Sequence, residues 1–352
     1  MLIVRPIQER DLDGLLAMAQ QVGDGMTTLK PDRAMLRQRL DIACASFAGT
    51  IPLEQRDYLF ALEDTTSGTL AGVSAIKSAV GLDEPFYNYR VGTLVHSSSD
   101  LGVFSRMETL YLSNDLTGCS ELCTLFLRPT YRTGNNGRLL SRSRFLFIAQ
   151  FPHLFDKKLI AELRGVQDEN GRAPFWEGLG RHFFRIDFAR ADDLTSLGKK
   201  SFIAELMPRH PLYVAYLPED ARAAIGQVFC DTAPVRRLLE AEGMNYEGYC
   251  DIFDAGPVLQ GRVSELRAMK ESVLAQVRAP GYAEAAAADA AAADAAPWLV
   301  ANTSLSDFRV IVADGAPVDG GIVLDAAQRQ ALRTGDDPVR VMQLNPGKTT
   351  HA

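Results

Sequence analysis

The stretch Glu121–Leu140, with the sequence ELCTLFLRPTYRTGNNGRLL, is expected to decide the fold. It opens with the mostly apolar run Leu122–Leu127, which is short and bounded enough to be a buried strand. Pro129 ends that strand because proline has no backbone N–H to donate. A turn rich in glycine and asparagine follows, and from Leu139 to Gln150 the apolar residues recur at helical spacing. The order strand, turn, helix predicts one unit of an α/β sheet.

The turn between this strand and helix has the features of an anion site. Glycine and asparagine tolerate the left-handed backbone that such a turn needs, and a helix start offers free N–H groups and a positive dipole end. Arg132, Asn135 and Gly137 resemble the R-x-x-G-x-G/A pattern that holds the coenzyme A pyrophosphate in GNAT-type acyltransferases, with Asn135 in the place of the first glycine. We expect the segment Arg132–Arg138 to bind a pyrophosphate. An ordinary strand-to-helix turn is the alternative.

The composition indicates a globular protein rather than a nucleic-acid or membrane protein. At 352 residues the chain has the length of roughly two domains, and 47% hydrophobic residues are enough for a core. The formal charge of −7, with dispersed basic residues, argues against a nucleic-acid partner. No apolar run approaches the ~20 residues that cross a bilayer, and the start does not resemble a signal peptide. We therefore expect a cytoplasmic protein.

The cysteines and histidines do not form a metal-binding pattern. The five cysteines are scattered, and Cys119 with Cys123 has no second pair at zinc-like spacing. The five histidines include no H-x-x-x-H or H-E-x-x-H motif. We expect no metal, and structural thiols in a reducing compartment.

Residues 1–150 are expected to form the first half of an acyltransferase body with a mixed sheet, of the α/β or α+β class. Strands are predicted at Leu2–Arg5, Tyr58–Leu62 and Leu70–Ile76, and helices after Asp11 and at Pro31–Phe47. A strand, an Arg-Pro pair and an Asp-capped helix also resemble the beginning of a GNAT domain. A polar turn that contains Asp115 precedes the central strand, so we expect Asp115 near the mouth of any site there.

Residues 151–277 are expected to complete that body as a second α/β half. Helices are predicted from Pro174 and at Thr232–Gly243, and strands at Leu159–Arg164, Phe183–Phe188, Ser201–Met207 and Tyr249–Phe253. The unit helix, Leu-Gly, strand that ends at Phe188 is loosely repeated as helix, Glu-Gly, strand ending at Phe253. This repetition suggests two related halves.

The C-terminal part is expected to be separate from the body. Residues 278–297 are dominated by AEAAAADAAAADAAP, which favours helix by composition but has no amphipathic face. A linker is therefore the better interpretation. Residues 298–346 contain four short strand patterns and would form a small β module. On this division, a chain cut at Pro280 should keep a folded body.

Eight stretches together resemble the arginine N-succinyltransferases of bacterial arginine catabolism, a GNAT-like family. They are PFYNYRVGTLVH (85–96), LSNDLTG-x-SELCTLFL (112–127), GRLLSRSRFLFIA (137–149), AELRG (161–165), PFWEGLGRHFF (174–184), FIAELMPRHPLY (202–213), IGQV (225–228) and DIFDAGP (251–257). The resemblance covers the chain from Met1 to about Val277 and is weaker in the tail.

The resemblance implies attack by the α-amine of L-arginine on the thioester of succinyl-CoA, giving N2-succinylarginine and CoA. Succinyl-CoA is then a co-substrate, and no permanently bound cofactor is expected. Leu125 stands at the family's succinyl-CoA position, where a backbone N–H would stabilise the developing oxyanion. Residue type alone suggests Arg90 and Arg164 as partners of the succinyl carboxylate. It also suggests Asp115, Glu121 and Asp251 as partners of the acceptor's guanidinium. For each of these five residues, a structural ion pair is the alternative.

One position departs from the family. After IGQV the family has a histidine regarded as its proton donor, and here that position is Phe229, which cannot transfer a proton. Cys230 and His210 are the candidate substitutes, although an inert thiol is the alternative for Cys230. Two classes of function stay open. One is an active acyl-CoA N-acyltransferase, acting on arginine or on another amine. The other is a catalytically weakened partner subunit of an arginine/ornithine succinyltransferase, in a homo- or hetero-oligomer.

Overall fold

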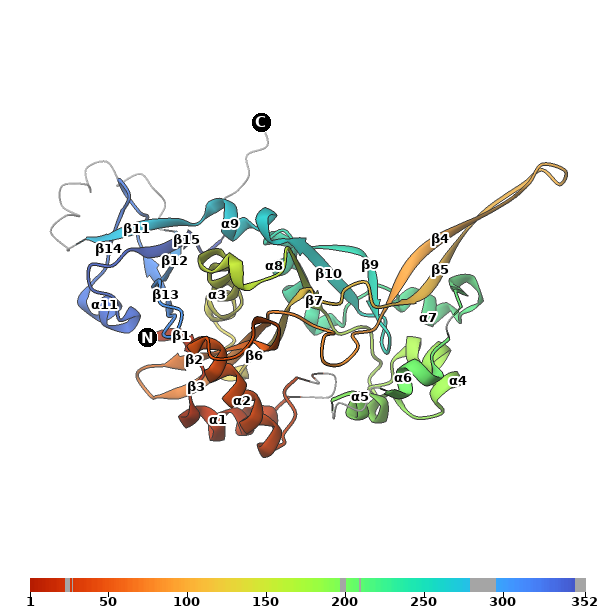
Figure 1. The fold of residues 1–352 in the computed structure, drawn as a ribbon, viewed down its shortest axis with the longest axis horizontal. Coiled ribbons are helices and arrows are strands. Elements are labelled where there is room, and N and C mark those ends of the chain that lie inside the picture. Colours follow the sequence, from red (N-terminus) through yellow and green to blue (C-terminus); the bar gives the residue numbers. More distant parts are fainter. Residues whose placement is uncertain (23–25, 27, 197–200, 209, 279–295, 346–352) are drawn as a thin grey trace.

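The computed structural model describes residues 1–22, 26, 28–196, 201–208, 210–278 and 296–345. The molecule is elongated (Figure 1), with the C-terminal strands and α11 (Ala326–Leu332) at one end. The helices α4 to α7 and a long hairpin lie at the other end, and the N-terminal elements form the middle.

A single mixed sheet runs through the molecule. Its fifteen described strands are ordered β14-β11-β15-β12-β13-β1-β2-β3-β6-β7-β10-β9-β4-β5-β8. Neighbouring strands are antiparallel except for the parallel pairs β6–β7 and β11–β14. The bounds are β1 Leu2–Pro6, β2 Asp57–Asp64, β3 Thr69–Lys77, β4 Asn88–Ser98, β5 Val103–Ser113, β6 Ser120–Leu127, β7 Lys158–Glu162, β8 Leu212–Tyr213, β9 Asn245–Asp251, β10 Pro257–Arg262, β11 Val273–Arg278, β12 Pro297–Ala301, β13 Val310–Asp314, β14 Gly321–Val323 and β15 Val339–Gln343. The predicted mixed α/β class is confirmed.

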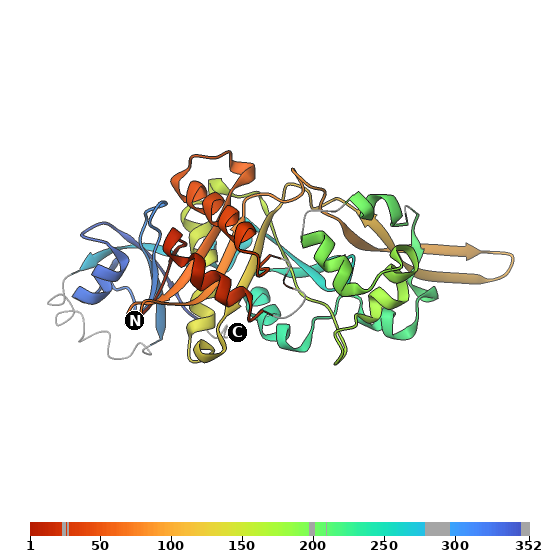
Figure 2. The ribbon, with the colours of Figure 1, turned by 90° about the horizontal axis from the view of Figure 1, so that it is seen from below.

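Helices cover both faces of the central strands (Figure 2). Alternate side chains of β2 enter two different cores, as the geometry of a strand requires. Leu59 and Ala61 pack against α1 (Leu12–Ala19) and α2 (Arg33–Ala48). Tyr58 and Phe60 pack in the core that contains α3 (Asn136–Gln150). The central strands are therefore buried on both sides, which fixes the position of β6 and of the turn that follows it.

The predicted strands at Phe183–Phe188 and Ser201–Met207 are wrong. The chain instead forms α4 (Arg181–Phe184), α5 (Phe188–Ser196) and α6 (Ser201–Leu206). Phe184 and Phe188 are four residues apart and both pack on Trp176, with ring centroids 5.3 and 6.4 Å from its ring. The two phenylalanines lie in separate short helices, which Arg185 divides with a left-handed φ of 56°, and both rings are held by the indole. Because no strand ends at Phe188, the first of the two predicted helix–strand units is not formed as expected, and the suggested repetition loses its support.

The other described helices are short. The helix predicted at Thr232–Gly243 is present as α8 (Ala233–Ala241), and Gly243 follows it with a left-handed φ of 99°. Two further helices, α7 (Glu219–Ala224) and α9 (Arg267–Glu271), flank it in the chain.

Strands β4 and β5 form a hairpin that leaves the body. Their paired residues run from Asn88 with Ser113 to Ser98 with Val103, and only the base of the hairpin pairs with β9 and β8. Figures 1 and 2 both show its outer part projecting away from the other elements. Four apolar side chains near its end are exposed: Val95, Leu101, Val103 and Phe104.

The C-terminal strands are continuous with the main sheet. β13 pairs with β1 through Val310 and Val4, and β11, before the predicted linker, pairs with β15, after it. Phe308 packs on Phe147 of α3, with ring centroids 4.9 Å apart. Residues 279–295 of the predicted linker lie outside the described residues. The division into 1–150, 151–277, 278–297 and 298–346 stays a prediction, although sheet and core contacts join the last part to the first.

Candidate active site

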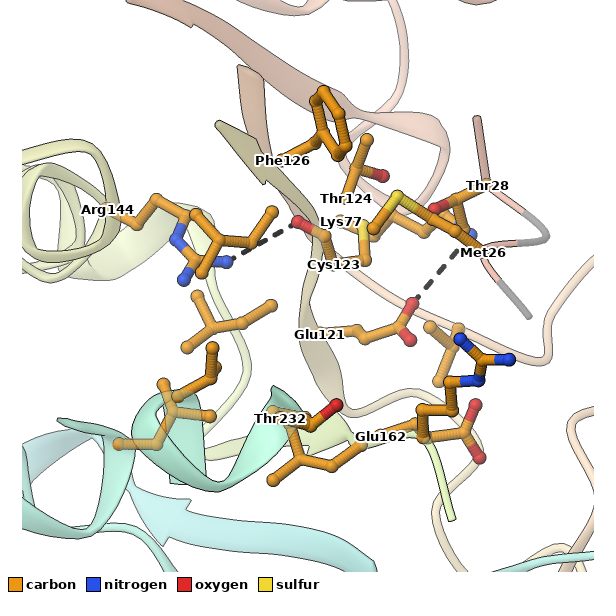
Figure 3. A pocket seen from close by; sticks show the side chains of 18 of the residues that line it. Met26, Thr28, Lys77, Glu121, Cys123, Thr124, Phe126, Arg144, Glu162 and Thr232 are labelled. Carbon is orange, nitrogen blue, oxygen red and sulfur yellow. Dashed lines mark hydrogen bonds and ion pairs between the residues drawn. The ribbon is translucent and has the colours of Figure 1, made fainter. Parts of the chain in front are cut away.

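The two central parallel strands separate and leave a cleft. β6 and β7 pair at Ser120 with Leu159 and at Glu121 with Ile160. Further along, β6 continues beside β3 and β7 beside β10. The cleft has a volume of about 1640 Å³, and its two walls include residues 122–127 on one side and 161–164 on the other. Figure 3 looks into it.

A β-bulge lies in the wall that β6 forms. Val73 of β3 faces Phe126 and Ala75 faces Cys123, so Thr124 and Leu125 together oppose a single residue. Thr124 has a φ of 51°, a left-handed conformation that costs about 1–3 kcal/mol. Its buried hydroxyl has no hydrogen-bond partner among the described residues. A strained residue with an unsatisfied hydroxyl beside a cleft is typical of a ligand site.

The turn after β6 brings the predicted pyrophosphate residues to the cleft. In α3 the N–H of Leu139 donates to the carbonyl oxygen of Asn135 at 2.8 Å, and the amides before Leu139 precede this ladder. Arg132, Gly137 and Arg138 are exposed and line the cleft. Asn135 is not among the described lining residues; its Oδ1 accepts a hydrogen bond from Nη1 of Arg138 at 3.2 Å.

The cleft is acidic where β6 and β7 begin to separate. Glu121, Glu162, Asp251 and Asp254 all line it, and Figure 3 shows Glu121 and Glu162 on neighbouring strands. Burial, and then the charges of Asp251 and Glu121, raise the pKa of Glu162 well above its ordinary value. Burial and the charge of Asp251 raise the pKa of Asp254 to about 8. A bound cation would stabilise the ionised form of these carboxylates.

Three motifs from the sequence meet on the β7 side of the cleft. Asp254 in DIFDAGP accepts a hydrogen bond from the N–H of Gly165 in AELRG at 2.7 Å. The N–H of Gly226 in IGQV donates to the carbonyl oxygen of Ala255 at 2.9 Å. A Cβ atom on Gly256 would lie 2.0 Å from the carbonyl oxygen of Leu163. Glycine at this position is what allows the two segments to approach so closely.

Phe229 lines the same side and takes part in its packing. Its N–H donates to the carbonyl oxygen of Arg164 at 2.9 Å, and the guanidinium carbon of Arg164 lies 4.8 Å from the centre of its ring. His210 and Cys230 are both exposed, and neither is among the described residues that line the cleft. The structure therefore brings neither predicted substitute into the cleft.

Two of the predicted substrate-binding residues lie elsewhere. Arg90 and Asp115 are exposed and form an ion pair at 3.9 Å, and the hydroxyl of Tyr249 donates to Asp115 at 2.9 Å. Neither is among the described residues that line the cleft. The geometry favours the structural alternative for these two, whereas Glu121, Asp251 and Arg164 do line it.

Several charged residues that line the cleft had no role predicted from the sequence, among them Lys77, Arg144, Glu162 and Asp254. The Nζ atom of Lys77 lies 3.7 Å from Oε2 of Glu121. Arg144 directly precedes the apolar residues of RFLFIA, and Glu162 interrupts the apolar stretch LIAEL. Because charged side chains are rarely buried in such stretches, this interruption is the signal that would have found them.

Within the described part of the chain, metal-binding side chains do not gather in threes or more. No described helix has both the length and the apolar character needed to cross a bilayer.

Comparisons with known proteins identify the family. A family model described as the arginine N-succinyltransferase beta subunit matches residues 2–268, and a second, described as the C-terminal domain of that subunit, matches residues 283–343. The chain belongs to the arginine N-succinyltransferase beta subunit family. The family that the sequence resembles is thereby confirmed.

Members of the arginine N-succinyltransferase family match this chain along nearly its whole length. A protein named arginine N-succinyltransferase from Shigella flexneri serotype 5b (strain 8401) is 46% identical over 345 residues, which is 98% of each chain. One of the same name from Enterobacter sp. (strain 638) is 46% identical over 355 residues, 99% of this chain and 100% of the relative.

A solved structure supports the fold. The structure of arginine/ornithine succinyltransferase subunit AI from Pseudomonas aeruginosa has a TM-score of 0.87 and 33% sequence identity, covering 98% of this chain and 99% of that one. The predicted GNAT-like fold is consistent with this neighbour.

Proposed function

We propose that this chain is an acyltransferase that transfers the succinyl group of succinyl-CoA to the α-amine of L-arginine, releasing N2-succinylarginine and CoA. The observation that carries the proposal is the cleft between β6 and β7. An anion-binding helix start lies after the far end of β6, and a group of carboxylates lies where β6 begins. A ligand with phosphates at one end, which reacts with a cationic acceptor, matches this distribution of charge.

Coenzyme A would bind along the β6 side. The pyrophosphate would receive hydrogen bonds from the amides at the start of α3, with Arg132 and Arg138 neutralising its charge. The thioester carbonyl would lie at the bulge, within hydrogen-bond distance of the N–H of Leu125. That N–H would stabilise the oxyanion that forms when the amine attacks.

Arginine would bind on the acidic side. Its guanidinium carries a charge that Glu121, Glu162 and Asp251 would neutralise, and this leaves its α-amine free to reach the thioester carbon. The amine must lose a proton to attack, and the CoA thiolate that leaves must gain one. Phe229 can do neither. The proton transfers would therefore need water or one of the cleft carboxyl groups whose pKa is raised, such as Glu162 or Asp254.

One assay tests this function directly. We expect the purified chain alone to release CoA thiol from succinyl-CoA, at a rate that depends on added L-arginine. Ornithine and other amines in place of arginine define the acceptor. A chain that binds succinyl-CoA but releases no thiol with any amine would contradict the proposed activity.

A second candidate function rests on Phe229. The family resemblance implies a histidine at this position, which this chain lacks. On this alternative, the chain is a catalytically weakened subunit that supports an active homologue. The exposed apolar end of the β4–β5 hairpin would suit such an oligomer. Mixing this chain with a homologous subunit that has histidine at this position should then give a succinyltransferase activity higher than the sum of the activities of the two separate proteins.

We also expect the protein to work in the cytoplasm. All five cysteines are free thiols, as in proteins from reducing compartments.

A further inference from the structure

Arg144 is a buried cation in the wall of the cleft. It lies on α3 and is only 2% exposed, yet it is one of the residues that line the cleft. Its Nε donates to the carbonyl oxygen of Ser141 at 3.2 Å and its Nη2 to the hydroxyl of Ser141 at 3.0 Å. Its Nη1 donates to the carbonyl oxygen of Cys123 at 3.4 Å, as Figure 3 shows. All three of these acceptors are neutral.

Other buried arginines in this chain have carboxylate partners. Arg5 pairs with Asp11 at 2.7 Å, and Arg142, two residues from Arg144, pairs with Glu242 at 2.7 Å. No carboxylate lies within ion-pair distance of Arg144 among the described residues. Burial without a carboxylate lowers the pKa of Arg144 to about 10, so the side chain is still a cation at neutral pH. A buried charge without a counter-ion is costly, and a ligand that brings an anion would remove that cost.

The position of Arg144 defines the ligand group that it would meet. Cys123, whose carbonyl it contacts, directly precedes the bulge at Thr124 and Leu125. If the thioester carbonyl lies at the bulge, the acyl chain starts there, and in a succinyl group only three carbon–carbon bonds separate the thioester carbon from the terminal carboxylate. The unsatisfied hydroxyl of Thr124 lies in the same wall.

We propose that Arg144 binds the terminal carboxylate of the succinyl group and so selects a dicarboxylic acyl-CoA over a monocarboxylic one. This inference rests on the proposed function and assigns one of its specificity residues. The two arginines suggested by residue type fit this role less well. Arg90 is exposed and pairs with Asp115, and Arg164 stacks on Phe229, on the side of the cleft that holds the carboxylates.

A comparison of two acyl-CoA esters tests the inference without requiring turnover. Butyryl-CoA has the same chain length as succinyl-CoA with a methyl group in place of the carboxylate. The Kd of each ester is measured by calorimetry for the wild type and for Arg144→Leu, Arg164→Leu and Arg138→Leu. The ratio of the two Kd values isolates the contribution of the carboxylate, because the CoA part is shared.

We expect the wild type to bind succinyl-CoA more tightly by on the order of 10- to 100-fold, as a charge-assisted hydrogen bond predicts. Arg144→Leu should bring this ratio close to one and leave the Kd of butyryl-CoA nearly unchanged. Arg138→Leu, the matched control at the pyrophosphate, should weaken both esters equally and preserve the ratio. If Arg144→Leu does not fold, Arg144→Lys, which keeps the charge, should fold and give an intermediate ratio.

Three results would overturn the inference. The first is an unchanged ratio in folded Arg144→Leu. The second is loss of the ratio in Arg164→Leu but not in Arg144→Leu, which would move the carboxylate to Arg164. The third is a wild type that binds both esters equally, which refutes selection by Arg144 while CoA binding stands. A wild type that binds neither ester refutes the proposed function itself.

Discussion

The two walls of the cleft are built from the chain in different ways. We call residues 122–138, which form β6, the turn and the start of α3, the CoA wall. The acceptor wall consists of residues 161–165, 226–229 and 251–256. The CoA wall is one continuous segment, so the order of its strand, turn and helix is encoded by neighbours in the sequence. The acceptor wall brings together three segments far apart in the chain, joined by hydrogen bonds such as that from Gly165 to Asp254. A local pattern can be read from sequence, whereas an assembled one needs the fold.

The two walls also differ in charge. The CoA wall has exposed arginines and a helix N-terminus, both of which attract phosphate. The acceptor wall holds Glu162 and Asp254, whose pKa values are raised by burial and by the charges of neighbouring carboxylates. On the proposed function, the first wall would be ready for its anionic ligand when empty, whereas the charges of the second would be balanced only when a cation binds. The predictions below test this difference, from the largest expected effect to the smallest.

Deletion of residues 280–352 should unfold the CoA wall. The deletion removes β12, β13 and β15, which contact α3, and it removes Phe308 from the core around Phe147. It also removes the backbone of Leu344, whose carbonyl accepts a hydrogen bond from Arg142 of α3. From the sequence alone, a chain cut at Pro280 is expected to keep a folded body. These contacts predict instead that the truncated chain loses its fold. A truncated chain that stays soluble, with the near-UV circular dichroism of the full chain, would show that the body is independent of its tail.

Gly137→Glu should lower the affinity for CoA by roughly 1,000-fold, because a carboxylate beside the pyrophosphate is a like-charge contact that costs several kcal/mol. Among the described residues, a Cβ atom at this position would have just one atom within 4 Å, Cδ2 of Leu127 at 3.9 Å, so thermal unfolding should hardly change. Gly137→Ala is the matched control and should bind CoA nearly as well as the wild type. Unaltered CoA affinity in a folded glutamate variant would mean that the pyrophosphate does not bind at this turn.

Phe229→His tests whether the acceptor wall is still arranged for a proton donor. In a preserved site kcat should rise by up to ~100-fold, the lower end of what general acid–base catalysis contributes, with little change in the KM for succinyl-CoA. Phe229→Ala, which opens the same space without a titratable group, should give no gain. Equal behaviour of the two variants, together with loss of activity in Cys230→Ala or His210→Ala, would assign the proton to one of those residues. If every variant is inert with arginine and succinyl-CoA, the partner-subunit alternative is favoured.

Glu162→Gln should flatten the pH dependence of stability. The pKa of Glu162 is raised in the folded protein, so the folded state binds more protons than the unfolded state. Its contribution is complete below the unfolded pKa of about 4.3 and is lost as the pH rises through the folded pKa. We expect the Tm of the wild type to fall as the pH rises through that range, and to fall less in the glutamine variant. Arginine should raise the Tm most at high pH, where the carboxylates are ionised. A pH profile identical in the two proteins would contradict this assignment.

The sequence predicted the CoA wall well because its signals are local. Pro129, the asparagines and glycines of the turn, and the apolar periodicity after Leu139 all point to the structure that is found. The segment Phe183–Phe188 was misread as a strand because its run of apolar residues suits a strand as well as a helix. The choice between the two depended on the indole packing against both rings, which is a tertiary contact.

The candidate site was predictable only in part, for the same reason. Glu121, Asp251 and Arg164 were suggested by residue type and do line the cleft. Arg90 and Asp115 were suggested by the same argument and pair with each other on the surface. Residue type cannot distinguish these cases, because burial and the identity of the nearest opposite charge are properties of the folded chain. Glu162 shows the converse, since its pKa is raised by burial and then by the charges of carboxylates on other strands, all of which depend on the fold.

The pairing of β1 with β13 has a consequence for how the protein is made. β1 is synthesised long before β13, its outer neighbour in the sheet. Until then the outer edge of β1 has unpaired N–H and C=O groups, which are a template for aggregation. Closing such a long loop also slows folding. Chains that terminate before β13 would therefore keep an open edge of β1, and we expect them to aggregate more readily than chains in which β13 covers that edge.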